Sequence, residues 1–127
     1  MPANILIVED EEILRDLIAE QLKKKGYEIR LAADGEAGWR MLGEQKPDLL
    51  LLDLLMPLMS GYDVLTKMRA DADLKDVPCI VISNSGQMDD LNRAYDCGAD
   101  DVLIKADFNP DQVVEKIEQL LAKSKQK

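Results

Sequence analysis

Polar residues that could take part in chemistry stand directly after four short apolar runs of this sequence. Glu9 and Asp10 follow NILIV, and Asp53 follows DLLLL. Ser83 follows PCIVI, and Lys105 follows DVLI. A carboxylate inside an apolar segment is costly unless another group stabilises its charge. Asp53 is therefore the most informative of the five, because the leucines around it give a carboxylate no structural role.

The apolar runs have the length and composition of short strands. Three of them are almost continuously apolar, which is typical of strands that are buried on both faces of a parallel sheet. The run YEIRL alternates instead, so we expect it at an edge of the sheet. The runs that we predict as strands are 4–8, 27–31, 48–52, 78–82 and 101–104.

Longer segments with helical periodicity separate these runs. Ser60 is a candidate N-cap for one of them, and Asn109 with Pro110 fits an N-cap followed by a first-turn proline. One segment carries an apolar stripe of Ile13, Leu14, Leu17, Ile18 and Leu22. The segments that we predict as helices are 11–25, 34–45, 60–70, 86–97 and 110–122.

This alternation predicts an α/β fold, a doubly wound (βα)5 parallel sheet with right-handed crossovers and helices on both faces. We expect one domain over residues 1–122 and a frayed tail over 123–127. Ligands of such sheets bind at the carboxyl ends of the strands. Because these ends meet at one edge, we expect the five polar residues to lie close together.

Three carboxylates gathered at one edge predict a cation site. Like charges at that distance cannot all stay ionised unless a cation joins them. Hard oxygen ligands suit Mg²⁺. Lys105 adds a fixed positive charge, and the Ser83 hydroxyl can donate a hydrogen bond. These groups suit phosphoryl transfer onto a carboxylate.

Most of these residues also have a plain structural interpretation. Glu9 and Asp10 could cap the first helix, where acids interact favourably with the helix dipole. Ser83 could be a turn residue, and Lys105 could be a surface lysine. Matches at four strand ends together favour a site over coincidence.

Composition restricts the possible functions further. The 127 residues carry a net charge of −9 and contain no His. This charge argues against binding nucleic acid, and the lack of His excludes His acid–base chemistry and His metal ligands. Cys79 and Cys97 form no CxxC motif, which predicts a reduced, cytoplasmic protein. No apolar run approaches the ~20 residues of a membrane span.

The chain resembles a response regulator receiver domain, the phospho-accepting module of two-component signalling that includes chemotaxis regulators. The matching motifs are VEDEE (8–12), DLLMPLMSG (53–61), ISNS (82–85) and GADDVLIK (98–105), and the similarity covers essentially the whole chain. The resemblance implies a flavodoxin-like sheet with strand order 2-1-3-4-5. It also implies phosphorylation by a histidine kinase or phosphotransfer protein, and signalling through contacts with a downstream protein that the sequence does not identify.

The resemblance also implies roles for individual residues. Asp53 would be the phosphorylated residue. Mg²⁺ would be held by Glu9, Asp10, Asp53 and the backbone carbonyl of Leu55. Lys105 would pair with a phosphoryl oxygen. A domain of this kind catalyses only its own phosphorylation and dephosphorylation, and it is not an enzyme in the usual sense.

Five further residues matter for the loops and for the switch that reports phosphorylation. Ser83 would bind the phosphoryl group, while Pro57 and Gly61 would shape the loop after the third strand. The switch position that usually holds an aromatic residue holds Val102 here. The lysine is followed by Ala106 instead of the usual proline, and a cis bond before a non-proline residue costs about 2.5–4 kcal/mol. We therefore expect a rearranged loop with a trans bond there.

Two alternatives compete with a phosphorylated receiver. One is a receiver-fold interaction module that works without phosphorylation, which Val102 and Ala106 favour. The other is an enzyme with the same architecture. A flavodoxin-like carrier would need a phosphate-binding loop where EDEE stands, and an aspartate-based phosphatase would typically have a second Asp at the position of Leu55.

Overall fold

The structure is a computed structural model that describes residues 3–56, 58–84, 87–107 and 109–125. Strands and helices alternate along these residues, and a single 3₁₀ turn (Lys105–Asp107) follows the last strand. The strands are β1 (Asn4–Val8), β2 (Glu28–Ala32), β3 (Leu49–Asp53), β4 (Cys79–Ser83) and β5 (Asp101–Ile104). The helices are α1 (Glu12–Lys24), α2 (Gly35–Glu44), α3 (Gly61–Ala70), α4 (Met88–Asp96) and α5 (Pro110–Lys125).

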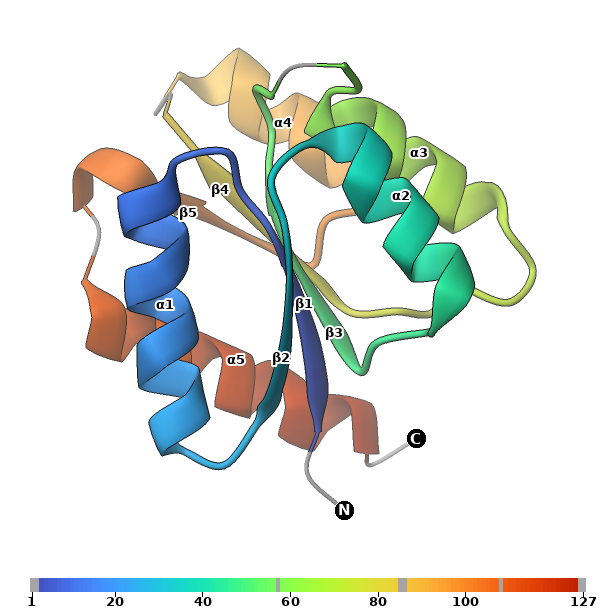
Figure 1. The fold of residues 1–127 in the computed structure, drawn as a ribbon. Helices are drawn as coiled ribbons and strands as arrows, with labels where there is room; N and C mark the ends of the chain where they lie inside the picture. The colour runs from blue at the N-terminus through green and yellow to red at the C-terminus, as the bar shows by residue number, and fades with distance from the viewer. Residues whose placement is uncertain (1–2, 57, 85–86, 108, 126–127) are drawn as a thin grey trace.

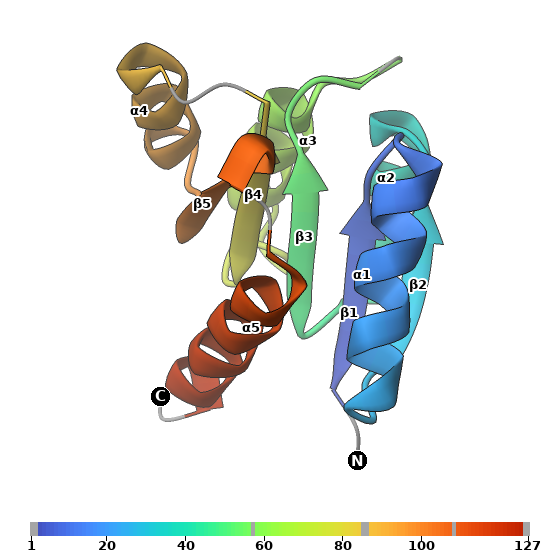
Figure 2. The same cartoon turned by 90° about the vertical axis from the view of Figure 1, so that its left-hand side faces the viewer.

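The strands form one parallel sheet in the order β2-β1-β3-β4-β5, as predicted. Helices α1 and α5 cover one face, and α2, α3 and α4 cover the other (Figures 1 and 2). The alternating strand YEIRL lies at an edge, which confirms its predicted place. Each predicted strand overlaps an observed one, with a displacement of at most one residue.

The core has two parts because the central strands bury both of their faces. Every residue of β1, β3 and β4 is buried. Leu6 and Val8 point into the layer under α2, α3 and α4. Ile5 and Ile7, which alternate with them, point into the layer under α1 and α5. These runs are continuously apolar because both faces of the strands are buried between two layers of helices.

The predicted apolar stripe of α1 is only partly correct. Ile18 and Leu22 are buried against the sheet, but the side chain of Ile13 is 86% exposed and that of Leu17 is 38% exposed. The apolar stripe is wider than the contact that α1 makes with the sheet. Because successive residues turn by about 100° around a helix, the side of the stripe that carries Ile13 and Leu17 faces away from the core.

Two of the helix starts carry the side-chain caps that the sequence predicts. Ser60 Oγ accepts a hydrogen bond from the Asp63 N–H at 3.2 Å, and Asn109 Oδ1 accepts one from the Asp111 N–H at 2.9 Å. Both caps confirm the sequence prediction. Helix α5 continues to Lys125, past the predicted end at residue 122. No helix in the described ranges is long and apolar enough to cross a membrane.

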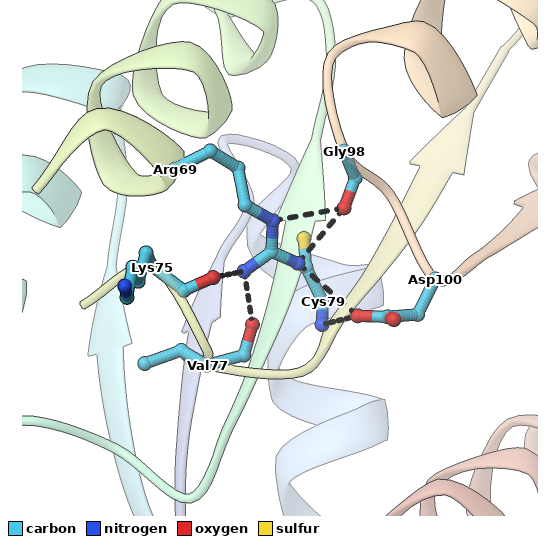
Figure 3. A network of polar contacts seen from close by, with 6 residues as sticks. All are labelled: Arg69, Lys75, Val77, Cys79, Gly98 and Asp100. Atoms are coloured by element: carbon cyan, nitrogen blue, oxygen red, sulfur yellow. Dashed lines mark hydrogen bonds and ion pairs between the residues drawn. The ribbon is translucent and has the colours of Figure 1, made fainter.

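Arg69, near the end of α3, joins three segments at the amino end of the sheet (Figure 3). Its guanidinium donates five hydrogen bonds, at 2.6–3.1 Å, to other described residues. The acceptors are the carbonyls of Lys75, Val77 and Gly98 and the carboxylate of Asp100. The Asp100 carboxylate also accepts from the backbone N–H of Cys79, the first residue of β4, at 2.8 Å. This network fixes the entrances to β4 and β5.

Candidate functional site

The predicted site residues meet at the carboxyl edge of the sheet because of the strand register. Val8 of β1 pairs with Leu52 of β3, so Glu9 and Asp53 come next on neighbouring strands. Ser83 ends β4, and Lys105 directly follows β5. The arrowheads of β1, β2 and β3 point to this edge in Figure 2, and β4 and β5 run parallel to them. The parallel topology thus brings four distant segments of the chain together.

The acidic cluster consists of Glu9, Asp10 and Asp53. One carboxylate oxygen from each residue lies within 4.8 Å of those of the other two. The side chains of Glu9 and Asp53 are only 1% exposed, whereas Asp10 is exposed. Such a set of hard oxygen ligands, open to solvent on one side, could hold a divalent cation.

Hydrogen bonding of the acidic cluster is incomplete. Both carboxylate oxygens of Asp53, and Oε1 of Glu9, are buried and accept no hydrogen bond from the described residues. As carboxylates, the three acids are acceptors only, so they cannot satisfy one another. Lys105 pairs with Glu9 and Asp53 from one side, and a proton or a second cation could satisfy the oxygens further. The donor set and its unsatisfied oxygens therefore fit the Mg²⁺ that the sequence predicts.

The pKa values of two acids reflect this arrangement. Burial raises the pKa of Asp53 to about 8, and a hydrogen bond to Glu9 and its nearby charge act in the same direction. The hydrogen bonds of Asp53 with Glu9 and Asp10 form only when Asp53 carries a proton, which turns one of its oxygens into a donor. Burial alone would raise the pKa of Asp10, but hydrogen bonds with Asp53 and Glu9 hold it below its ordinary value. Of these two acids, Asp53 therefore binds a proton more tightly than Asp10 does.

Lys105 lies across from the acids and contacts three carboxylates. Its Nζ lies 2.9 Å from Glu9 Oε1, 2.8 Å from Glu11 Oε2 and 3.3 Å from Asp53 Oδ2. Burial alone would lower the pKa of Lys105, but hydrogen bonds to Glu11 and Glu9 and the charge of Asp53 raise it above its ordinary value. Lys105 therefore stays cationic throughout the physiological pH range.

Among the described acids that pair with Lys105, Glu11 is the one that sequence reasoning does not single out. It stands inside the acidic run EDEE, where Glu9 and Asp10 carry the resemblance. Its partner lies 94 residues further along the chain. Only the convergence of β1 and β5 at one edge could have suggested this contact.

The other predicted residues lie around this centre. Ser83 is buried at the end of β4, and Leu55 is exposed in the loop after β3. Gly61 lies against the backbone of Asp53 and Leu54, and any larger residue would clash with the Asp53 carbonyl. The Gly61 N–H also donates to the Leu54 carbonyl at 2.8 Å. Gly61 therefore allows α3 to start directly beside the acceptor strand.

Three further predictions concern the switch and the loops. Val102 is half-buried on β5 and packs against the core on the α3 and α4 side. No cis peptide bond occurs in the described residues, so the bond between Lys105 and Ala106 is trans, as predicted. A 3₁₀ turn begins at Lys105. Pro57 lies outside the described residues.

Comparison with known proteins identifies the family. The family model of the response regulator receiver domain matches residues 5–118. The DNA-binding dual master transcriptional regulator RpaA of Synechocystis is 32% identical over 121 residues, which are 95% of this chain and 50% of that regulator. The chain therefore spans about half the length of this relative.

Two solved structures show the same fold. The CheY-like receiver domain protein of Methanospirillum hungatei has a TM-score of 0.92 and 25% identity, over 99% of this chain and 98% of that one. The receiver domain of a Syntrophus aciditrophicus signal transduction histidine kinase has a TM-score of 0.87 and 30% identity, over 94% and 90%. The chain belongs to the response regulator receiver domain family.

Proposed function

We propose that this receiver domain is phosphorylated on Asp53 by a histidine kinase or phosphotransfer protein and passes the signal on through protein–protein contacts. The observation that carries the proposal is the state of Asp53. Its two oxygens are buried without a hydrogen-bond donor among the described residues, at the edge of the sheet and 3.3 Å from the Lys105 ammonium. A carboxylate placed in this way has no evident structural role, but it suits a nucleophile.

Mg²⁺ would be held by Glu9, Asp10, Asp53 and the backbone carbonyl of Leu55. The metal would supply positive charge against the phosphoryl oxygens. The three carboxylates bring the ligand oxygens, and the exposure of Asp10 leaves room for metal-bound water and a donor. Pro57 and Gly61 would keep the loop with Leu55 in place.

In the proposed reaction an Asp53 oxygen attacks the phosphorus of a phosphohistidine. The new O–P bond forms while the P–N bond breaks, and its electron pair leaves with the imidazole of the donor. Lys105 would pair with a phosphoryl oxygen, and the Ser83 hydroxyl would donate a hydrogen bond to another. The domain would turn over only its own phosphoryl group, by acquiring it and by losing it to water.

The partners we propose are proteins. The relative RpaA is described as DNA-binding, but this chain spans only half of it, and a net charge of −9 disfavours contact with nucleic acid phosphates. Cys79 and Cys97 are free thiols, which supports a place in the reducing cytoplasm.

A second candidate function is a receiver-fold interaction module that acts without phosphorylation. Val102 supports it, because a half-buried valine offers no ring that could rotate between an inner and an outer position. Ala106 departs from the usual proline next to the lysine. The two functions differ in whether Asp53 must be modified for partner binding.

Beryllofluoride, a mimic of the phosphoryl group, separates the two candidates. We expect its addition with Mg²⁺ to shift the backbone NMR signals of residues at the carboxyl edge of the sheet. Asp53→Asn should abolish these shifts. Asp76→Asn is the matched control, because it is the same substitution at an exposed acid near the amino end of the sheet. This variant should keep the response to beryllofluoride. A wild type without Mg²⁺-dependent shifts contradicts the proposed function.

A further inference from the structure

We propose that Glu11 is a positioning residue that holds Lys105 and slows phosphorylation of Asp53 until an incoming phosphoryl group displaces it. This inference rests on the proposed function. Its basis is the ion pair between Glu11 Oε2 and Lys105 Nζ at 2.8 Å, the shortest that the lysine makes with the described residues.

The three carboxylates around Lys105 differ in how easily they can leave. An ammonium group has three N–H donors, and Glu9, Glu11 and Asp53 offer three acceptors. A phosphoryl oxygen that pairs with Lys105 must take the place of one of them. The side chains of Glu9 and Asp53 are 1% exposed, whereas that of Glu11 is 55% exposed. Glu11 can therefore move into water, and the other two cannot.

The backbone keeps Glu11 beside the site while its side chain remains free to move. The Glu11 N–H donates to Glu9 Oε2 at 3.1 Å, and its carbonyl accepts from the Arg15 N–H at 2.9 Å. The residue is the N-cap of α1, and its side chain makes no capping hydrogen bond there. The carboxylate is thus available for Lys105 and competes with a phosphoryl anion for the same cation.

The charge of Glu11 has a second effect on an anionic phosphodonor. A carboxylate on the solvent side of Lys105 repels a negatively charged donor as it approaches. Removing the charge without changing the size of the side chain, as in Glu11→Gln, should speed phosphorylation by about threefold to fivefold, as expected for a half-exposed ion pair. The effect should shrink as the ionic strength rises, because salt screens exposed charges.

The test measures phosphorylation by acetyl phosphate at saturating Mg²⁺, in wild type, Glu11→Gln and Glu12→Gln. Glu12 is the matched control, because it is the exposed neighbour in sequence and loses the same charge in the variant. We expect faster phosphorylation of Glu11→Gln only, most clearly at low salt. Equal rates in the two variants, or a slower Glu11→Gln, would overturn the inference while leaving the proposed function intact.

A second measurement tests the contact without any phosphodonor. The side-chain ¹⁵N signal of Lys105 should shift in Glu11→Gln and stay in place in Glu12→Gln. An unchanged Lys105 signal in Glu11→Gln refutes the contact itself. If the wild type takes up no phosphoryl group at all, the proposed function fails, and the inference about its rate fails with it.

Discussion

The two ends of the sheet each hold a cluster of charged side chains. The two clusters differ in how many of their polar atoms have hydrogen-bond partners. At the amino end, Arg69 donates five hydrogen bonds to fixed acceptors. At the carboxyl end, the two buried oxygens of Asp53 accept no hydrogen bond from the part of the chain that the structure describes, although Lys105 lies 3.3 Å away. The hydrogen bonding of the Arg69 cluster is complete in the folded chain, whereas the carboxylate oxygens of Asp53 still need a donor or a cation.

This difference separates a structural cluster from a functional one. Buried polar groups in folded proteins are nearly always hydrogen-bonded, so each exception requires an explanation. The network of Arg69 links α3 to the entrances of β4 and β5 and has no free donor to offer. The acidic cluster costs stability as folded, and a proton or a metal cation that joins it beside Lys105 reduces that cost.

The largest change in stability that we predict follows from removing Arg69, which holds the cluster at the amino end together. Arg69→Ala leaves several backbone carbonyls without donors and should lower the free energy of unfolding by about 3 kcal/mol. Arg40→Ala on α2 is the control. Its exposed ion pair with Glu44 should contribute no more than about 0.5 kcal/mol. Urea unfolding of the two variants measures the difference, and equal losses would contradict a structural role for Arg69.

A substitution in the acidic cluster at the carboxyl end should change the free energy of unfolding in the opposite direction. Asp53→Asn removes a buried carboxyl group and supplies an amide that can donate to Glu9 and Asp10. Without divalent cations at pH 8, we expect the free energy of unfolding to rise by about 1–2 kcal/mol. A decrease of similar size would mean that Asp53 stabilises the fold, which contradicts the comparison between the two ends.

The same variant gives a prediction for pH. The pKa of Asp53 is about 8 in the folded chain and near 3.8 when unfolded, so the folded state binds more protons between these values. Stability should therefore fall as the pH rises from about 4 to about 8 and then level off. Asp53→Asn should lack this decline when unfolding is followed from pH 5 to 9. A parallel decline in both proteins would rule out Asp53 as its source.

Binding of Mg²⁺ should change the stability of the folded state by a smaller amount. A ligand at ten times its Kd stabilises the folded state by about 1.4 kcal/mol. Wild type and Arg69→Ala should gain this amount equally, because the two ends are far apart and their contributions add. Asp10→Asn should gain much less. Thermal unfolding with Mg²⁺ or with EDTA gives the answer, and an undiminished gain in Asp10→Asn would place the ion elsewhere.

The sequence predicts the carboxyl end far better than the amino end. The apolar runs define the strands, and parallel strands bring residues that follow them to one edge, so Glu9, Asp53 and Lys105 could be placed together. Most acceptors of Arg69 are backbone carbonyls, which lie up to 29 residues away in the sequence. A backbone carbonyl leaves no mark in the sequence, so no pattern points to this network.

Other features depend on packing that local patterns do not contain. Ile13 and Leu17 continue the apolar stripe of α1, but the sheet contacts only the side that carries Ile18 and Leu22. Glu11 reads as one more acid of the run EDEE, and its contact with Lys105 exists only because β1 and β5 end at the same edge. Periodicity predicts elements, whereas these contacts follow from how the elements are assembled.

Peptide mapping by mass spectrometry is the most direct test of the central claim that Asp53 accepts a phosphoryl group. The protein is treated with acetyl phosphate and Mg²⁺ and then reduced with borohydride, which converts an aspartyl phosphate to homoserine. We predict homoserine at position 53, and none when EDTA replaces Mg²⁺ or in Asp53→Asn. Unmodified Asp53 in the treated wild type, or modification at another acid instead, would contradict the account.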